Sequence, residues 1–235
     1  MQAAFVGEMI GTMTLVFLGC GVCAAVSLEK SFAKGAGWMV VVAAWAFAVA
    51  SGIFVSKALG GSGALNPVGP LANIALGKET VTDNLVQMAA EFCGAFLGAI
   101  LVWLHYWPHW SVTPDAATKR GVFCTSPAIR NPAFNFLSEF LGTFALVLIS
   151  SSIGKAVEGT IQAPLVGMTV WVVGLSLGGT TGWAINPARD LGPRLAHFLL
   201  PIPGKGDSDW SYAWIPVAGP FAGGVAAAFL YQAFS

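Results

Sequence analysis

The chain has 235 residues, of which 56% are hydrophobic and only 9% are charged. Eleven basic residues balance eleven acidic ones, so the charge gives no indication of a nucleic-acid partner. This composition excludes a soluble domain with a charged surface and indicates a protein that lies in a lipid bilayer.

Six apolar stretches are long enough to cross a bilayer as helices, since about 20 apolar residues span its hydrocarbon core. In chain order they cover 3–26, 36–57, 84–107, 134–153, 162–180 and 212–233. The first stretch lacks a basic segment before it and is long enough to span, so we interpret it as a membrane helix and not a signal peptide. The connections are short, and we expect one multi-pass domain over 1–235 in the cell membrane.

The sequence contains an internal repeat. Two pairs of segments match between the halves of the chain, namely 7–16 with 138–147 and 90–95 with 219–224. The halves, 1–110 and 131–235, therefore hold three spans each. Because three is odd, the second half must enter the membrane from the opposite side to the first. Such inverted repeats are typical of transport proteins, whose site lies near the midplane between the halves.

An Asn-Pro pair lies between the second and third span of each half, at Asn66-Pro67 and Asn186-Pro187. Asparagine is a favoured N-cap, and proline fits the first helical position. The 12 residues from Asn186 to His197 would make about 18 Å of helix, against a hydrocarbon core of about 30 Å. We therefore expect two re-entrant half-helices whose positive ends point at the membrane centre. The asparagine amides would offer donors to passing oxygen atoms.

Residues 181–194, with Asn-Pro-Ala-Arg-Asp at 186–190, resemble the second signature motif of the aquaporin (major intrinsic protein) family. The aspartate that follows this motif, Asp190, is similar to the pattern of the aquaglyceroporin branch, the glycerol facilitators. The resemblance covers nearly the whole chain and implies an all-α membrane protein with six transmembrane helices and two re-entrant half-helices. It also implies a homotetramer that passively conducts small uncharged solutes such as glycerol, with some water, and excludes ions and protons. It implies no enzymatic activity, no cofactor and no metal.

Carried onto this sequence, the resemblance implies three sets of functional residues. The selectivity filter comprises Trp45, Gly174, Trp183 and Arg189. The pore centre comprises Asn66, Pro67, Val68, Asn186, Pro187 and Ala188. The loops are braced by Glu8, Glu139 and Asp190. An arginine offers donors to hydroxyl oxygens and repels cations, whereas two indoles opposite a glycine make a wide apolar wall for a carbon backbone.

The first Asn-Pro segment departs from the family's pattern, because Val68 stands where the family commonly has alanine and Pro70 follows closely. Proline cannot donate to the carbonyl of Asn66, so the first turn should be distorted or the helix should begin later. A literal Asn-Pro-Ala occurs at 131–133, directly before a span. We interpret it as a helix start outside the pore.

The cysteines and histidines form no metal or catalytic pattern. Cys20 and Cys23 lie one turn apart in the first span, where we expect a packing role. His105 and His109 are four residues apart, but Pro108 interrupts the helix between them. We interpret both histidines as residues of the membrane interface.

Alternatives remain for the solute, the transport class and the orientation. Undissociated lactic acid or another three-carbon solute would suit the same channel, and the altered first motif favours this variant. An ion- or proton-coupled transporter would need titratable groups on the path, whereas the three central carboxylates, Glu8, Glu139 and Asp190, are interpreted as braces. The family implies cytoplasmic termini, yet this places more basic residues in the outer loops than in the inner ones, against the positive-inside rule.

Overall fold

The computed structural model describes residues 2–235 and contains helices and loops, with no strand in that range. Six helical segments of this range are long and apolar enough to cross a membrane. They are α1 (Gln2–Ser27), α2 (Trp38–Ala58), α4 (Val81–His105), α7 (Pro132–Ala156), α8 (Gln162–Leu177) with the preceding turn η1 (Gly159–Ile161), and α10 (Ile215–Phe234). Each lies within a few residues of a predicted stretch. The predicted six-span architecture is confirmed.

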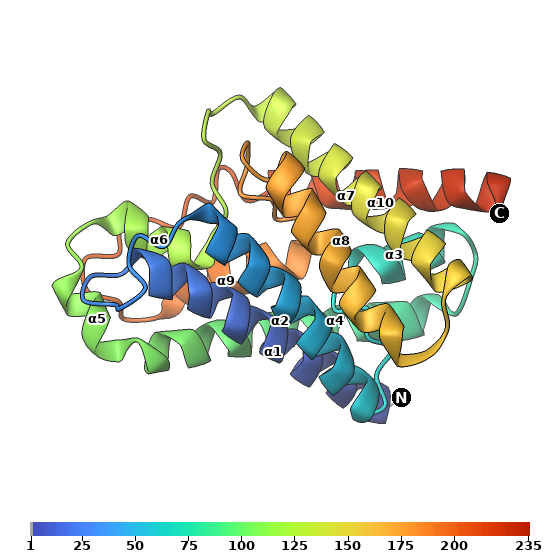
Figure 1. Ribbon diagram of the computed structural model, residues 1–235, viewed down its shortest axis with the longest axis horizontal. Coiled ribbons are helices and arrows are strands. Elements are labelled where there is room, and N and C mark those ends of the chain that lie inside the picture. Colours follow the sequence, from blue (N-terminus) through green and yellow to red (C-terminus); the bar gives the residue numbers. More distant parts are fainter. Residues whose placement is uncertain (1) are drawn as a thin grey trace.

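Two shorter helices begin at the Asn-Pro pairs, α3 (Val68–Ala75) and α9 (Pro187–Leu199). In Figure 1 both chain ends lie at the right, where α3 also lies, whereas α9 lies to the left of centre. The half-helices therefore enter from opposite sides, as an inverted repeat requires. The left end also holds α5 (Trp107–Val112) and α6 (Ala116–Phe123), two small helices in the connection between the halves that the sequence analysis did not predict.

The first turn of α3 is tighter than a regular α-helical turn. The amide of Gly69 donates to the backbone carbonyl of Asn66 at 3.1 Å, three residues back, where Pro70 leaves the usual fourth-residue bond unmade. The helix begins at Val68, two residues after Asn66, whereas α9 begins at Pro187, directly after Asn186. Both expected outcomes are therefore found, the distorted turn and the later start.

The Asn-Pro-Ala at 131–133 starts a spanning helix, as predicted. The side chain of Asn131 accepts a hydrogen bond from the amide of Phe134 at 3.4 Å and so caps α7. Pro132 then occupies the first helical position, where its missing N–H leaves no helical bond unmade.

Glycines allow the spans to approach closely in the equivalent helix pairs of the two halves. A Cβ placed on Gly98 of α4 would lie 2.6 Å from the carbonyl oxygen of Met13 in α1. A Cβ placed on Gly219 of α10 would lie 2.8 Å from the Cβ of Glu139 in α7. These contacts join α1 to α4 and α7 to α10, and they bring the helix that carries each buried glutamate next to its partner helix.

Replacing Gly98 by valine should therefore force α1 and α4 apart. Overpacking of a well-packed interior costs about 1–3 kcal/mol, so the variant should lose thermal stability in detergent. Gly21→Val is the matched control, since a Cβ at Gly21 meets no atom of the described residues within 4 Å. Equal melting temperatures for the two variants would contradict this account of the helix contact.

Candidate functional site: a pore between two half-helices

A cavity of about 360 Å³ lies between the two halves of the chain. Its wall is largely apolar, with contributions from α1, α2, α7 and α8, and both Asn-Pro segments reach it. The polar side chains on the wall include Asn66, Asn186 and Arg189, joined by Ser150 and Ser151 of α7. An apolar path with a few convergent hydrogen-bonding groups suits a small polar solute that has a carbon skeleton.

At the centre of the molecule the two half-helix starts are joined by crossed hydrogen bonds. The side-chain amide of Asn66 donates to the carbonyl of Ile185 at 2.9 Å, and that of Asn186 donates to the carbonyl of Leu65 at 2.7 Å. Each asparagine thus binds the residue that precedes the other. One N–H of each amide is used in this way, and the second remains for a solute oxygen in the cavity.

The side-chain oxygens of the same asparagines cap their own helices. The Oδ1 of Asn186 accepts from the amides of Ala188 at 3.0 Å and Arg189 at 3.1 Å. The Oδ1 of Asn66 accepts from the amide of Val68 at 3.1 Å. Because both ends of each side-chain amide are engaged, its orientation in the cavity is fixed.

Two buried glutamates hold the loops that lead into these helices. Glu8 accepts from the amide of Leu65 at 3.0 Å, and Glu139 accepts from the amide of Ile185 at 2.8 Å. Leu65 and Ile185 have φ of 53° and 43°, in the left-handed region that side chains disfavour. Such a conformation persists only where surrounding contacts impose it. Each glutamate therefore stabilises the strained residue whose carbonyl the opposite asparagine binds.

Three of the four residues expected in the filter line one part of the cavity. The guanidinium carbon of Arg189 lies 3.9 Å from the ring centroid of Trp45. The ring of Trp183 lies edge-on to Trp45, with centroids 6.4 Å apart. Gly174 lies against Trp183, since a Cβ there would approach within 2.9 Å of the indole. Its missing side chain therefore makes room for Trp183.

The comparisons with known proteins agree with this geometry. Residues 1–231 match the family described as Major intrinsic protein. The chain belongs to this family. It is 50% identical to the glycerol uptake facilitator protein of Bacillus subtilis, over 99% of this chain and 85% of that protein. It is 46% identical to glycerol uptake facilitator protein 3 of Lactiplantibacillus plantarum, over 96% of this chain and 94% of that protein.

Other similarities extend the picture of this major intrinsic protein. A protein of Lactiplantibacillus plantarum named D/L-lactic acid transporter is 35% identical, over 97% of this chain and 96% of that protein. Among solved structures, the aquaglyceroporin from Plasmodium falciparum superposes with a TM-score of 0.86 at 27% identity, covering 99% of this chain and 96% of that chain. The expected aquaporin fold is thereby confirmed.

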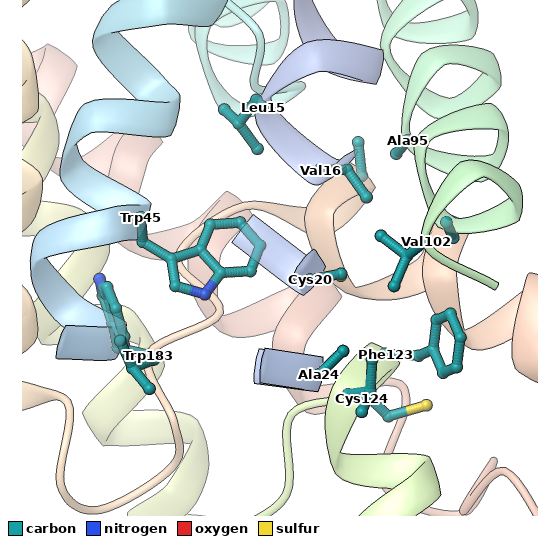
Figure 2. Packing of buried hydrophobic residues seen from close by; sticks show 14 of the residues in the cluster. Leu15, Val16, Cys20, Ala24, Trp45, Ala95, Val102, Phe123, Cys124 and Trp183 are labelled. Atoms are coloured by element: carbon teal, nitrogen blue, oxygen red, sulfur yellow. The ribbon is translucent and has the colours of Figure 1, made fainter. Parts of the chain in front are cut away.

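The residues against which Trp45 packs were not apparent from the sequence. Its indole N–H donates to the sulfur of Cys23 at 3.4 Å, and a side chain on Gly19 would overlap its ring. Figure 2 shows Trp45 reaching from α2 toward α1, with Trp183 on its other side. A further indole, Trp38, lies edge-on to Trp183 with centroids 5.3 Å apart. Gly19 and Cys23 are four residues apart and so share one face of a helix, but this spacing does not show which ring packs on that face.

The second half-helix is anchored by a buried ion pair. The Nε of Arg194 lies 2.8 Å from Oδ1 of Asp190, and both side chains are fully buried. The other oxygen of Asp190 accepts from the amide of Thr125 at 2.8 Å and from its hydroxyl at 2.6 Å. Arg194 in turn donates to the carbonyls of Thr125 and Ser208. Asp190 therefore fixes the loop before α7, and Arg194, which the sequence analysis did not single out, joins that loop to the one after α9.

The loop after α9 is also held by an ion pair that lies outside the membrane helices. Asp209 forms an ion pair with Arg130 and accepts from the hydroxyl of Ser211 at 3.0 Å. Burial raises the pKa of Asp209, but the hydrogen bonds from Arg130 and Ser211 outweigh it and leave the pKa below its usual value. The carboxylate therefore stays charged at neutral pH and keeps the loop after α9 in place.

Asp190→Ala should destabilise the protein by about 3–5 kcal/mol, because it leaves the guanidinium of Arg194 buried without its counter-charge. Unfolding in detergent would give the difference. Glu29→Ala is the control, since it removes an ion pair with Lys34 whose side chains are 38% and 43% exposed. The control should cost no more than about 1 kcal/mol. Similar losses for the two variants would contradict the anchoring role.

Gly19→Ala should push the ring of Trp45 toward Arg189 and narrow the filter. We expect glycerol flux to fall by about tenfold, with a smaller loss of water flux, because the added methyl group overlaps the ring. Gly21→Ala on the same helix adds the same group in open space and serves as the control. Proteoliposome flux for both solutes measures the effect, and an unchanged glycerol-to-water ratio would refute it.

Proposed function

We propose that this major intrinsic protein is a passive channel for glycerol that also passes some water. The observation that carries this proposal is the filter, where Arg189 faces a wall formed by Trp45 and Trp183. The relatives at 46–50% identity that are named glycerol uptake facilitators support the same solute. Glycerol has hydroxyl groups on one edge and carbon-bound hydrogens on the other, so it suits a filter with one polar corner and apolar walls.

Conduction follows from the order of groups along the cavity. In the filter, the guanidinium of Arg189 donates to solute hydroxyls while the carbon skeleton slides along the indoles. At the centre, the free N–H groups of Asn66 and Asn186 take over the hydroxyls. These bonds replace those that the solute loses to water, so no step requires covalent chemistry or energy coupling.

The same arrangement opposes cations and protons. Both half-helices direct their N-terminal ends, which carry partial positive charge, at the centre of the cavity. Arg189 adds a full positive charge beside the filter. A cation would lose its hydration shell on entry and find donors where it needs acceptors.

Lactic acid in its undissociated form is the second candidate. The 35% identity to a protein named D/L-lactic acid transporter favours it, although relatives named for glycerol are nearer at 46–50%. The neutral acid has three carbons and a hydroxyl group, so it would fit the same walls. The lactate anion would instead be drawn to Arg189 and held there.

We also propose a homotetramer with one pore in each subunit. The cavity lies within a single chain, so no partner is needed to complete it. Large apolar side chains such as Phe47, Phe134 and Leu141 are exposed on the spans, where lipid or a neighbouring subunit would cover them.

The first experiment is stopped-flow light scattering on proteoliposomes with glycerol, water and lactic acid, the acid at pH 4 and pH 7. Fast glycerol flux is expected, well above that of protein-free liposomes. Weak glycerol flux together with rapid acid entry at pH 4 alone would move the assignment to undissociated acids. Accumulation of any solute against its gradient would contradict a passive channel.

Arg189→Val should raise cation leak, because it removes the only full charge at the filter among the described residues lining the cavity. Conductance in planar bilayers with potassium chloride measures the leak. Lys30→Met removes a positive charge from an exposed loop and should leave the bilayer as tight as the wild-type protein does. Equal conductance for all three proteins would show that Arg189 takes no part in ion exclusion.

A further inference from the structure

The two half-helices differ at the second residue after the asparagine, which is Val68 in α3 and Ala188 in α9. Valine is bulkier than alanine, and Val68 lies on the wall of the cavity. A larger side chain at this position would be expected to narrow the pore centre. Val68 is nevertheless only 1% exposed, so its side chain is packed against protein.

The space that receives Val68 is provided by Gly224 of α10. A Cβ placed on Gly224 would overlap the Cγ1 methyl of Val68 and lie 3.4 Å from its Cβ. It would also lie 3.4 Å from the Cγ2 of Val147 in α7. A methyl group of Val68 therefore fills the space where a side chain of residue 224 would lie. Val147 of α7 packs against the same space.

The other half of the repeat has a different pair at the equivalent places. Segment 90–95 corresponds to 219–224, so Ala95 is the counterpart of Gly224, and Ala188 is the counterpart of Val68. Both alanines are fully buried, and α9 packs on α4 as α3 packs on α10. The second half-helix and its partner span thus have alanine at both positions, Ala188 and Ala95. The first half-helix and its partner span have Val68 and Gly224 there.

We infer that Gly224 is a positioning residue for the first half-helix: by accepting the side chain of Val68, it keeps α3 out of the pore and sets the width at the pore centre. The inference deepens the proposed function, since it concerns the path that glycerol would take. It predicts that the two positions are coupled. A larger residue at 224 is tolerated only when the residue at 68 becomes smaller.

The test is a cycle of three variants in proteoliposomes: Gly224→Ala, Val68→Ala and the double variant. Gly224→Ala should displace Val68 toward the cavity and lower glycerol flux per channel by about tenfold, with a smaller loss of water flux. The double variant recreates the pair of alanines found in the other half. It should restore both fluxes to within about twofold of wild type. Val68→Ala alone completes the cycle: the coupling between the two positions is the change in flux of the double variant beyond the summed changes of the two single variants.

Gly154→Ala in α7 is the matched control, because a Cβ there meets no described atom within 4 Å. Wild-type glycerol flux in Gly224→Ala, or a double variant no better than Gly224→Ala, would overturn the inference. If Gly224→Ala fails to insert, the double variant must recover both insertion and flux. Should the wild-type protein conduct no glycerol, the proposed function fails, while water flux across the same cycle still decides the role of Gly224.

Discussion

The pore depends on a reciprocal set of hydrogen bonds at the membrane centre. Each of the two asparagines binds the carbonyl that precedes the other, and each of those carbonyls belongs to a residue with positive φ whose amide is held by a buried glutamate. Two carboxylates, Glu8 in α1 and Glu139 in α7, thus determine where two amides point. The half-helix ends, and with them Trp183 and Arg189, take their positions from this arrangement, since both residues lie within three residues of Asn186 in the chain.

The packing around the centre follows the repeat without copying it. Glycines bring α1 to α4 and α7 to α10, so the glutamates reach both loops from equivalent places. The half-helices then differ in detail: α9 is anchored by the pair of Asp190 and Arg194, whereas α3 is shorter and packs through Val68 on α10. The repeat therefore determines how the spans pack. Residues that differ between the two halves determine the shape of each half of the pore.

The spans, the half-helices and the inverted repeat could be predicted from the sequence, because apolar length and Asn-Pro capping are local signals. The residues near the cavity could be named from the family motif. The packing of Trp45 against Gly19 and Cys23 could not be predicted from the sequence. The burial of Val68 against Gly224 could not be predicted either. These contacts join helices far apart in the chain, and a glycine shows in sequence only that space exists, without showing which side chain fills it.

The crossed asparagine bonds also set an order of events during synthesis. Asn66 and Ile185 are 119 residues apart in the chain, and Leu65 and Asn186 are 121 apart. While a ribosome is still making the second half, the loop at residue 66 has no carbonyl to bind from residue 185. Until then, the first half lies in the bilayer with some polar groups of this loop unpaired. The pore is complete only after the second re-entrant segment has been inserted.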